Sequence, residues 1–394
     1  MKEPFHLLVI AGDADGNLGD RAILFGLCRL IRESRPDARI TVVSADPGRM
    51  ARDLGVEAIP KGPGGLPAQL RAMAKADLVL CGGGGLFQDD DSLVKMPYWA
   101  LRVLAARLLA GRVVGFALGV GPLEARSSRL AARLAFACME RVSVRDREAL
   151  AVAQPLSRKP VDLVPDTALL LEPAPPAAVE AWLRGQGVPL DGRPLVGVAV
   201  RRWFPPRRRL VPNQISARFV KPKEADAPEA ARLPRLIARA LDAAAARRPF
   251  HALFLPTYLL PHEADDRVAE AALAEMRVAT GQILRLGDPA LYKGVAGRLD
   301  LLVGGRMHPT ILAAGMGTPV IGLAYNMKFK GFFDLIGQGE RLFDVAGFAR
   351  GGQEEALAER IVAALDGTAG NAPDTGALDG RIRGFARDVL GRAA

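Results

Sequence analysis

The sequence predicts an α/β protein built from two doubly wound, parallel-sheet halves. First, short apolar runs alternate with longer helical patterns over residues 5–172, which is typical of a parallel sheet covered by helices. Second, a similar alternating series begins at Leu195, after a stretch rich in Gly and Pro. Third, 394 residues are enough for two or three domains, each with its own core.

The apolar runs of the first half place its strands, and the amphipathic segments between them place its helices. The expected strands are residues 6–11, 40–44, 78–81, 113–118, 142–144 and 161–164. The expected helices are residues 20–32, 93–109, 126–139 and 146–153. We therefore assign residues 1–172 to an N-terminal domain.

The second half follows a predicted linker at residues 173–194 and is assigned to residues 195–375. Its expected strands are residues 195–200, 251–255, 282–286, 299–303 and 319–323. A basic, Pro-rich insertion interrupts it at residues 202–234, and a basic helix at 379–391 is expected within a C-terminal segment, 376–394. In such sheets, ligands bind beyond the carboxyl ends of the strands, so loops of the two halves could line one cleft.

Composition narrows the functional classes. A net charge of +10 favours acidic partners such as phosphorylated substrates or an anionic membrane surface. We expect no nucleic-acid partner, because aromatic residues are only 6% and no recognition motif occurs. The sequence has no apolar run long enough to span a membrane and no signal-peptide pattern, and its three cysteines have no metal-ligand spacing. These features predict a cytoplasmic protein without a metal or covalent cofactor.

An anion site is predicted where the strand at 299–303 ends. Arg306 and His308 follow that strand directly, and Pro309 suits the first turn of a helix. Two cation-capable side chains beside unpaired helix N–H groups favour phosphate or carboxylate. Arg201, at the end of the strand at 195–200, could join Arg306 around one anion. The alternative is that Arg306 and His308 only cap a buried loop.

Two loops of the first half carry acceptor groups instead of cations. Residues 12–20 lack both the glycine spacing of a dinucleotide loop and the ligand pattern of a calcium loop, but their acids and amide suit sugar hydroxyls. The alternative there is a helix N-cap at Asp20 with a solvated turn. The glycine run at 82–85, followed by Gln88 and Asp89, predicts a backbone that approaches a ligand closely. The predicted acceptor-binding residues are Asn17, Asp20, Gly83, Gly84, Gln88 and Asp89.

The basic insertion at 202–234 has two interpretations. Residues 201–223 contain eight Arg and Lys together with Trp203, Phe204 and Phe219. Such a segment could contact anionic lipid at the inner membrane face, or it could be a flap over the active site. A loop without a specific partner is the third possibility. His262 is expected to be an ordinary loop residue.

Taken in order, these motifs resemble the polysaccharide pyruvyltransferase family. The matching pieces span residues 11–333 and are Asn17-Leu18-Gly19-Asp20, Gly82–Gly85 with Gln88-Asp89, Val144-Arg145-Asp146, Pro165-Asp166, Pro256 with Asp265, and Gly305-Arg306-Met307-His308 running to Tyr325 and Lys328. The resemblance implies two Rossmann-like domains facing across a cleft, as in GT-B glycosyltransferases. It also implies transfer of pyruvate from phosphoenolpyruvate to two hydroxyls of a sugar, with formation of a cyclic ketal. This chain departs from the family pattern in its basic insertion and in Met307.

The resemblance carries phosphoenolpyruvate binding onto Arg306 and His308, with Arg201 as a further donor-binding arginine and Lys328 closing the same element. Independently, phosphoenolpyruvate carries two anionic groups and needs several cations, preferably Arg. His308 suits the acid that protonates its methylene carbon, although it could instead be only a donor ligand. The acceptor is expected to be a lipid-linked saccharide of an exopolysaccharide or envelope glycan. A nucleotide-sugar glycosyltransferase or epimerase, and a non-catalytic assembly module, remain as alternatives.

Overall fold

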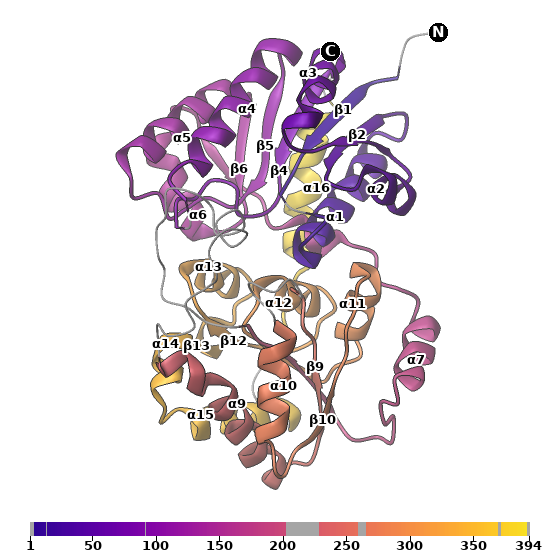
Figure 1. Ribbon diagram of the computed structural model, residues 1–394, viewed down its shortest axis with the longest axis vertical. Coiled ribbons are helices and arrows are strands. Elements are labelled where there is room, and N and C mark those ends of the chain that lie inside the picture. The colour runs from indigo at the N-terminus through magenta and orange to yellow at the C-terminus, as the bar shows by residue number, and fades with distance from the viewer. Residues whose placement is uncertain are drawn as a thin grey trace. The chain divides into compact units, whose positions relative to one another are not determined.

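The computed structural model describes residues 4–12, 14–90, 92–201, 228–258, 265–368 and 372–391. These residues form two compact units (Figure 1). Unit 1 contains the described residues up to Leu171 and those from Gly376 onward, and unit 2 contains the described residues from Glu172 to Thr375. Most of the basic insertion, residues 202–227, and His262 lie outside the described residues, so the predictions made for them stay predictions.

Unit 1 is built on a seven-stranded parallel sheet in the order β3-β2-β1-β4-β5-β6-β7. The strands are β1 (His6–Ile10), β2 (Arg39–Ser44), β3 (Glu57–Pro60), β4 (Leu78–Gly82), β5 (Val113–Leu118), β6 (Arg141–Val144) and β7 (Val161–Leu163). The four central strands β1, β4, β5 and β6 are almost entirely buried, as expected for a sheet covered on both faces.

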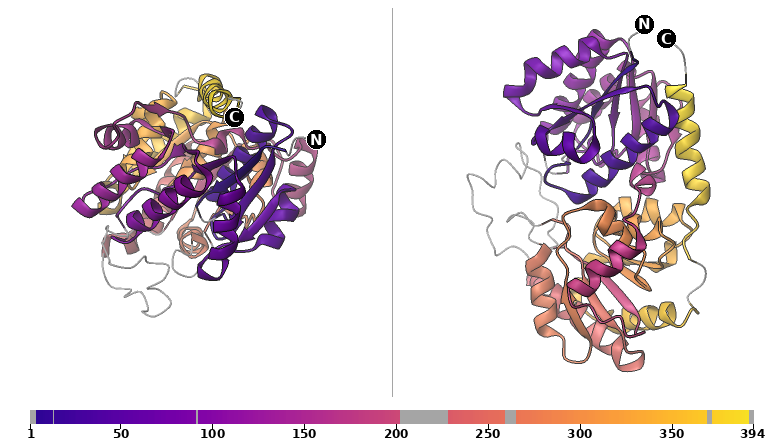
Figure 2. Two further views of the ribbon diagram at one scale, coloured as in Figure 1. Left: turned by 90° about the horizontal axis from the view of Figure 1, so that it is seen from above. Right: turned by 90° about the vertical axis from the view of Figure 1, so that its right-hand side faces the viewer.

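Helices cover both faces of this sheet. The helices of unit 1 are α1 (Leu18–Ser34), α2 (Pro47–Leu54), α3 (Leu66–Lys75), α4 (Lys95–Ala110), α5 (Arg126–Cys138), α6 (Arg147–Ala153) and α16 (Gly376–Leu390), with 3₁₀ turns η1 (Pro63–Gly65), η2 (Gln154–Leu156) and η3 (Thr167–Leu170). Helices α3, α4 and α5 pack successively against one another, whereas α1 packs against α16 and η3. Figure 2 shows α16, in yellow, on one side of the sheet and helices drawn in purple on the other. The C-terminal segment therefore completes the first unit.

Unit 2 repeats the arrangement with a six-stranded parallel sheet in the order β10-β9-β8-β11-β12-β13. Its strands are β8 (Leu195–Ala199), β9 (His251–Phe254), β10 (Thr280–Ile283), β11 (Leu301–Gly304), β12 (Val320–Ala324) and β13 (Leu342–Asp344). Its helices are α7 (Pro176–Gly185), α9 (Pro228–Arg247), α10 (Asp265–Glu275), α11 (Pro289–Ala296), α12 (Met307–Ala314), α13 (Met327–Leu335), α14 (Val345–Arg350) and α15 (Glu354–Leu365), with the 3₁₀ turn η4 (Gly339–Arg341).

The structure confirms the predicted fold class of two Rossmann-like α/β halves and corrects several elements. The edge strands β3 and β13 were not predicted, because each has a neighbour on one side only and is partly exposed, which leaves no apolar run in the sequence. Strand β10 begins at Thr280 and ends at Ile283, earlier than predicted. The predicted linker contains helix α7, and the last residues assigned to the insertion form the start of α9.

Each sheet has one point where the strand order reverses. The chain winds outward from β1 to β3 on one side and from β4 to β7 on the other, so the reversal in unit 1 lies between β1 and β4. In unit 2 it lies between β8 and β11. Loops leaving such a pair of strands diverge to opposite faces of the sheet and open a crevice at their carboxyl ends, where ligands bind in this class of fold. The loops at these two points are therefore the candidates for a ligand-binding site.

Candidate functional site

Arg201 and Arg306 flank the reversal point of unit 2. Strands β8 and β11 pair in register, with Ala199 opposite Gly304. Directly beyond, the backbone N–H of Gly305 donates to the carbonyl oxygen of Ala199 at 2.8 Å, which ties the two strand ends together. A Cβ at Gly305 would lie 3.4 Å from Cα of Val200, which is ordinary van der Waals contact. The sequence prediction that the two arginines share one sheet edge agrees with this geometry.

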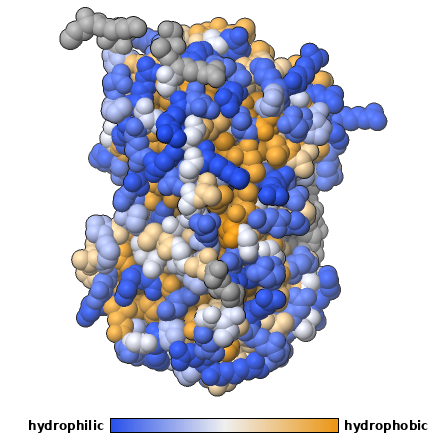
Figure 3. All heavy atoms as spheres, turned by 180° about the vertical axis from the view of Figure 1, so that it is seen from behind, coloured by the Kyte–Doolittle hydropathy of each residue, from blue (hydrophilic) through white to orange (hydrophobic). Residues whose placement is uncertain are grey.

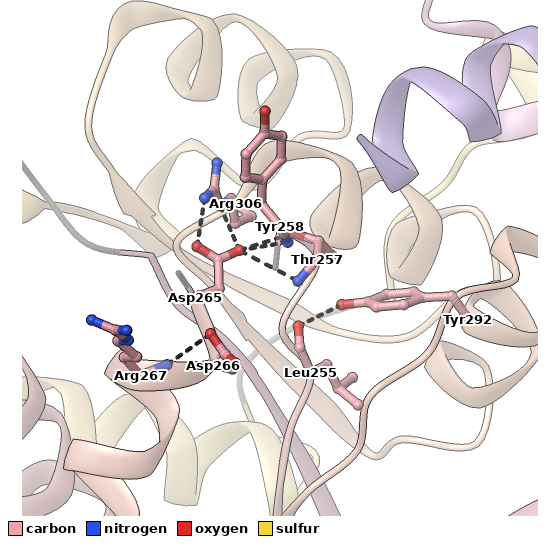
Figure 4. A network of polar contacts seen from close by, with 8 residues as sticks. All are labelled: Leu255, Thr257, Tyr258, Asp265, Asp266, Arg267, Tyr292 and Arg306. Carbon is pink, nitrogen blue, oxygen red and sulfur yellow. Dashed lines mark hydrogen bonds and ion pairs between the residues drawn. The ribbon is translucent and has the colours of Figure 1, made fainter. Parts of the chain in front are cut away.

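Arg306 is fixed by the carboxylate of Asp265, the first residue of α10. Its Nε donates to Oδ2 at 2.9 Å, and its Nη2 donates to Oδ1 (Figure 4). The Asp265 side chain is 0% exposed, whereas that of Arg306 is 13% exposed. Oδ2 also accepts from the backbone N–H groups of Thr257 and Tyr258. Asp265 therefore joins three segments and sets the orientation of the guanidinium at the end of β11.

Two tyrosines complete this network. The guanidinium carbon of Arg306 lies 5.6 Å from the ring centroid of Tyr258. The hydroxyl of Tyr292 donates to the carbonyl oxygen of Leu255 at 3.1 Å. Burial raises the pKa of Tyr292, and the nearby Asp265 carboxylate raises it further, so this phenol stays neutral. Tyr292 therefore holds the end of β9 in place as a neutral hydrogen-bond donor.

Arg201 stacks on an aromatic side chain at the end of β12. Its guanidinium carbon lies 4.4 Å from the ring centroid of Tyr325, and that ring meets Phe329 edge to face, with centroids 5.4 Å apart. A cation–π contact of this kind limits the positions that a guanidinium takes, and a guanidinium group can pair with a planar anion. A small pocket lies at this position, and its lining is Val200, Arg201, Leu233, Gly305, Leu323, Tyr325 and Val345.

His308 and Lys328 each lie in the first turn of a helix at the same sheet edge. Helix α12 begins at Met307 with Arg306 as its N-cap, earlier than the sequence indicated, so His308 is helical. Lys328 is the second residue of α13. Both side chains are half-buried. All four predicted donor residues thus follow β8, β11 or β12, which are neighbours in the sheet.

In unit 1, Asn17 and Asp20 open helix α1, and their roles differ from the capping alternative. The N-cap is Asn17, whose side-chain oxygen accepts from the backbone N–H of Gly19 at 2.8 Å. Asp20 lies in the first turn, with its carboxylate between two backbone segments. A Cβ at Gly12 would lie 2.9 Å from its Oδ2, and one at Gly84 would lie 2.7 Å from its Oδ1. Both glycines therefore make room for this carboxylate.

The glycine run after β4 adopts the backbone that the sequence suggested. Gly83 and Gly84 have φ values of +76° and +78°, in the left-handed region that side chains disfavour. A Cβ at Gly83 would lie 2.1 Å from Cγ2 of Ile23, so this position also has no room. Gln88 follows as a half-buried residue. The close approach in the structure is thus between this loop and the start of α1, and the approach of the loop to a ligand stays a prediction.

The side chain of Asp89 is buried and stabilises the fold. It is 0% exposed, and its Oδ2 accepts from the backbone N–H groups of Glu124 and Ala125 at 3.0 Å and 2.8 Å. Since Ala125 is the N-cap of α5, the carboxylate stabilises the start of that helix. We therefore correct the assignment of Asp89 to the acceptor-binding residues and leave it out of the candidate site.

Arg145 is the residue of this edge that the sequence prediction missed. It follows β6, is buried, and donates from Nη1 to Oδ2 of Asp166 at 2.9 Å, with its Nε 3.7 Å from Asp146. Burial alone would lower the pKa of Arg145, but the carboxylates of Asp166, Asp146 and Asp20 outweigh it and raise the pKa. The signal was present in the sequence, as a charged residue directly after a strand with acids in two neighbouring motifs.

The model of the family described as "Polysaccharide pyruvyl transferase" matches residues 17–327, which contain every predicted site residue except Lys328. The chain belongs to the polysaccharide pyruvyl transferase family. No curated protein matches the chain in sequence. Among the described residues, no group of three or more His, Cys, Asp or Glu side chains is placed to hold a metal ion.

Several solved structures share the fold of this pyruvyl transferase family member. UDP-GlcNAc 2-epimerase from Methanocaldococcus jannaschii aligns with a TM-score of 0.63 at 13% identity, covering 98% of this chain and 99% of that one. UDP-GlcNAc 2-epimerase from Neisseria meningitidis aligns with a TM-score of 0.59 at 11% identity, covering 98% and 100%. E. coli ADP-heptose LPS heptosyltransferase II aligns with a TM-score of 0.52 at 13% identity, covering 93% and 100%. The fold is thus that of GT-B glycosyltransferases and epimerases, as predicted.

Proposed function

We propose that this polysaccharide pyruvyl transferase moves the pyruvyl group of phosphoenolpyruvate onto two hydroxyls of a sugar, forming a cyclic ketal and free phosphate. The observation that carries the proposal is the pair Arg201 and Arg306 at the ends of adjacent strands β8 and β11. In a member of this family, two guanidinium groups at the reversal point of a doubly wound sheet are well suited to a small dianionic donor.

The geometry of unit 2 supports binding of this donor. Phosphoenolpyruvate carries a phosphate and a carboxylate, and each can pair with a planar guanidinium. Arg306 is held in one orientation by Asp265, and Arg201 by Tyr325. Side chains fixed before the ligand arrives lose little conformational freedom on binding. Helix α12 adds the backbone N–H groups of its first turn, which favour an anion.

In the proposed reaction, His308 donates a proton to the donor substrate. One sugar hydroxyl adds to C2 of phosphoenolpyruvate and gives its proton to a phosphate oxygen, while a proton is delivered to C3. The bond from C2 to the phosphate oxygen then breaks, phosphate leaves with the electron pair, and the second hydroxyl closes the ketal as it loses its proton. His308 lies in the first turn of α12, directly after Arg306, and imidazole titrates near neutral pH. It is our candidate for the group that protonates C3.

Unit 1 is proposed to bind the saccharide through Asn17, Asp20 and Gln88, beside the glycine loop that holds Gly83 and Gly84. Its strand ends offer carboxylate and amide oxygens, which accept hydrogen bonds from hydroxyls and repel phosphate. We propose a lipid-linked saccharide of an exopolysaccharide or envelope glycan as the acceptor. Asp20→Asn should raise the acceptor KM or lower kcat and leave donor affinity unchanged. Loss of donor affinity instead would assign the two ligands to the opposite units.

Titration calorimetry with phosphoenolpyruvate tests the donor site. Arg306→Ala should weaken binding by about 2 kcal/mol or more, which is about thirtyfold, because it leaves an anionic ligand group without its partner. Arg298→Ala is the matched control, since Arg298 precedes β11 and so lies at the opposite end of the same strand. Equal affinity in the parent protein and the Arg306 variant would exclude the assignment.

Product analysis tests the reaction itself. The protein incubated with phosphoenolpyruvate and lipid-linked saccharides should release phosphate and yield a product whose mass corresponds to addition of pyruvate minus water. His308→Gln should lower kcat by about 10²-fold or more. Its loss of affinity for phosphoenolpyruvate should be smaller than that of Arg306→Ala.

The alternative function is that of a nucleotide-sugar enzyme. It is favoured by the fold, because one similar structure is described as UDP-GlcNAc 2-epimerase from Neisseria meningitidis bound to UDP-GlcNAc. Nucleotide-sugar sites usually offer an acid for the ribose hydroxyls, whereas residues 325–330 of this chain carry Lys328 and Lys330 and no acid. Calorimetry with UDP-GlcNAc distinguishes the two functions. Binding of UDP-GlcNAc together with no binding of phosphoenolpyruvate would establish the alternative.

A further inference from the structure

Helix α4 of unit 1 exposes an unusually apolar outer face. Its buried side is the regular series Met96, Trp99, Ala100, Val103 and Ala106, which packs toward the sheet. The opposite side should therefore be polar, yet Leu101 is 67% exposed and Leu108 is 76% exposed. Tyr98, Leu104 and Leu109 are also exposed large apolar residues. A solvated helix normally has only one apolar side, the side that faces the core, so a second group of large apolar residues on the outer side of α4 needs an explanation.

Helix α5 extends this surface. It packs beside α4 (Figure 1) and buries Ala131, Ala132, Ala135 and Phe136. Its outer side carries Leu130 and Leu134, which are four residues apart and 58% and 60% exposed. Single apolar residues scattered among hydrophilic ones are normal on a protein surface. The face in Figure 3 is mostly hydrophilic, with hydrophobic areas between the hydrophilic residues. A group of exposed leucines on two adjacent helices indicates an interaction surface.

The charges of the two helices have one sign. Neither α4 nor α5 contains an Asp or a Glu, and their charged residues are Lys95, Arg102, Arg107, Arg126, Arg129 and Arg133. Long basic side chains around an apolar face are typical of helices that lie in the interface of an anionic membrane. The leucines would enter the headgroup boundary while the guanidinium groups contact lipid phosphates.

We infer that the outer faces of α4 and α5 form a docking surface for an anionic lipid bilayer. Charge complementarity selects this partner over a second copy of the chain. A two-fold contact through this surface would bring the same basic rim against itself, and the exposed charges of Arg107, Arg126, Arg129 and Arg133 on the two copies would repel one another. A bilayer containing acidic lipids offers both the apolar depth and the opposite charge.

The position of the surface in the chain has a functional consequence. Six residues separate Gln88, the last residue of the glycine loop, from Lys95, the first residue of α4, so the segment proposed to bind the saccharide and the membrane-facing helix are close in sequence. If the acceptor is lipid-linked, as proposed above, membrane docking would hold unit 1 near its substrate. The docking surface does not depend on that reaction, because it is argued from exposure and charge alone.

Vesicle co-sedimentation of the full chain tests the inference. With vesicles of zwitterionic lipid plus phosphatidylglycerol, the parent protein should pellet at low salt and be released at high salt. Leu101→Glu with Leu108→Glu, and separately Arg129→Glu with Arg133→Glu, should each reduce the membrane partition coefficient by about tenfold or more. All four side chains are exposed, so both variants should keep the thermal stability of the parent.

Two controls make the test specific. Val278→Glu also replaces an exposed apolar residue, but in unit 2, and it should not change pelleting. Arg381→Glu with Arg387→Glu makes the same charge change on α16 as the arginine pair on α5, and it should reduce binding much less. Parent-like pelleting of both the leucine and the α5 arginine variants would overturn the inference. So would a stable dimer, seen by light scattering, that the leucine variant dissociates while the parent binds no vesicles. Activity on a soluble saccharide is measured in parallel, so failure of membrane binding and failure of the proposed reaction can be told apart.

Discussion

The contact between Asp265 and Arg306 makes a quantitative prediction, because the two partners are buried to different degrees and have different other contacts. We consider Asp265→Asn, which keeps the shape of the side chain and removes its charge. Both carboxylate oxygens accept hydrogen bonds, Oδ1 from Arg306 and Oδ2 from Arg306, Thr257 and Tyr258. An amide has one acceptor oxygen, so its NH₂ group must face a donor in either orientation.

The cost follows from these contacts. Removing one member of a buried ion pair typically costs about 3–5 kcal/mol, and the isosteric amide recovers part of it, so we expect a loss of about 3 kcal/mol in unfolding free energy. Arg306→Met should cost less, about 2 kcal/mol, because the Asp265 carboxylate keeps the N–H groups of Thr257 and Tyr258. The double variant should cost less than the sum of the two by about 1–2 kcal/mol, since both substitutions remove the same contact.

Urea unfolding followed by hydrogen exchange and mass spectrometry can measure these costs for unit 2 alone. Peptides from α10 and β9 report its unfolding, which matters because the two units need not unfold together. The same variants provide a functional reading, since Asp265→Asn should weaken phosphoenolpyruvate binding by releasing the orientation of Arg306. An Asp265→Asn protein that unfolds at the urea concentration of the parent, or a strictly additive double variant, would refute the structural role given to this pair.

Three further predictions concern backbone, thiols and pH. Gly83→Ala should lower the unfolding free energy by about 2 kcal/mol more than Gly317→Ala in urea titrations. Both glycines have nearly equal positive φ, but a Cβ at Gly83 would lie 2.1 Å from Cγ2 of Ile23, whereas one at Gly317 would meet nothing within 4 Å. Iodoacetamide should modify the half-buried Cys138 before Cys81 in the native protein, because burial raises the pKa of Cys81 to about 12. Mass spectrometry should show that this difference in modification rate between the two thiols disappears in urea. Burial lowers the pKa of His251 below its usual 6.5. As the pH falls, the unfolded state therefore binds this proton before the folded state does, and the unfolding free energy decreases. His251→Gln should make this decrease smaller, as measured between about pH 7.5 and about pH 5.5.

The sequence predicted the buried central strands of both sheets closely, because a strand covered on both faces is a continuous apolar run with sharp ends. Strand β5 has its predicted bounds, and β1 differs by one residue. The strands that the sequence prediction missed lie at the sheet edges, where a strand has a neighbour on one side only. Strand β3 contains Glu57 and Pro60 and is only half-buried, so nothing in its local pattern distinguishes it from a loop.

The candidate site could be predicted in part for a related reason. The position of Arg201 and Arg306 at the ends of neighbouring strands could be predicted, because each arginine closely follows an apolar run in the sequence. That Asp265 holds Arg306 could not be found, because the two residues are 41 positions apart and meet only through the order of the strands. Asp89 was misassigned because a buried carboxylate that stabilises a helix start and a ligand-binding carboxylate have the same appearance in sequence.

The two units show why the fold alone does not determine the function. Both have the same winding and the same reversal point, yet the strand ends of unit 1 gather Asp20, Asp146 and Asp166 around Arg145, whereas those of unit 2 present Arg201 and Arg306. Epimerases and glycosyltransferases share this fold at 11–13% identity, so the backbone tolerates very different chemistry at these ends. A carboxylate-rich edge favours hydroxyls and an arginine-bearing edge favours an anion. Under the proposed function, one architecture would bind a sugar and phosphoenolpyruvate because the charged residues at its two edges differ, with no change of topology.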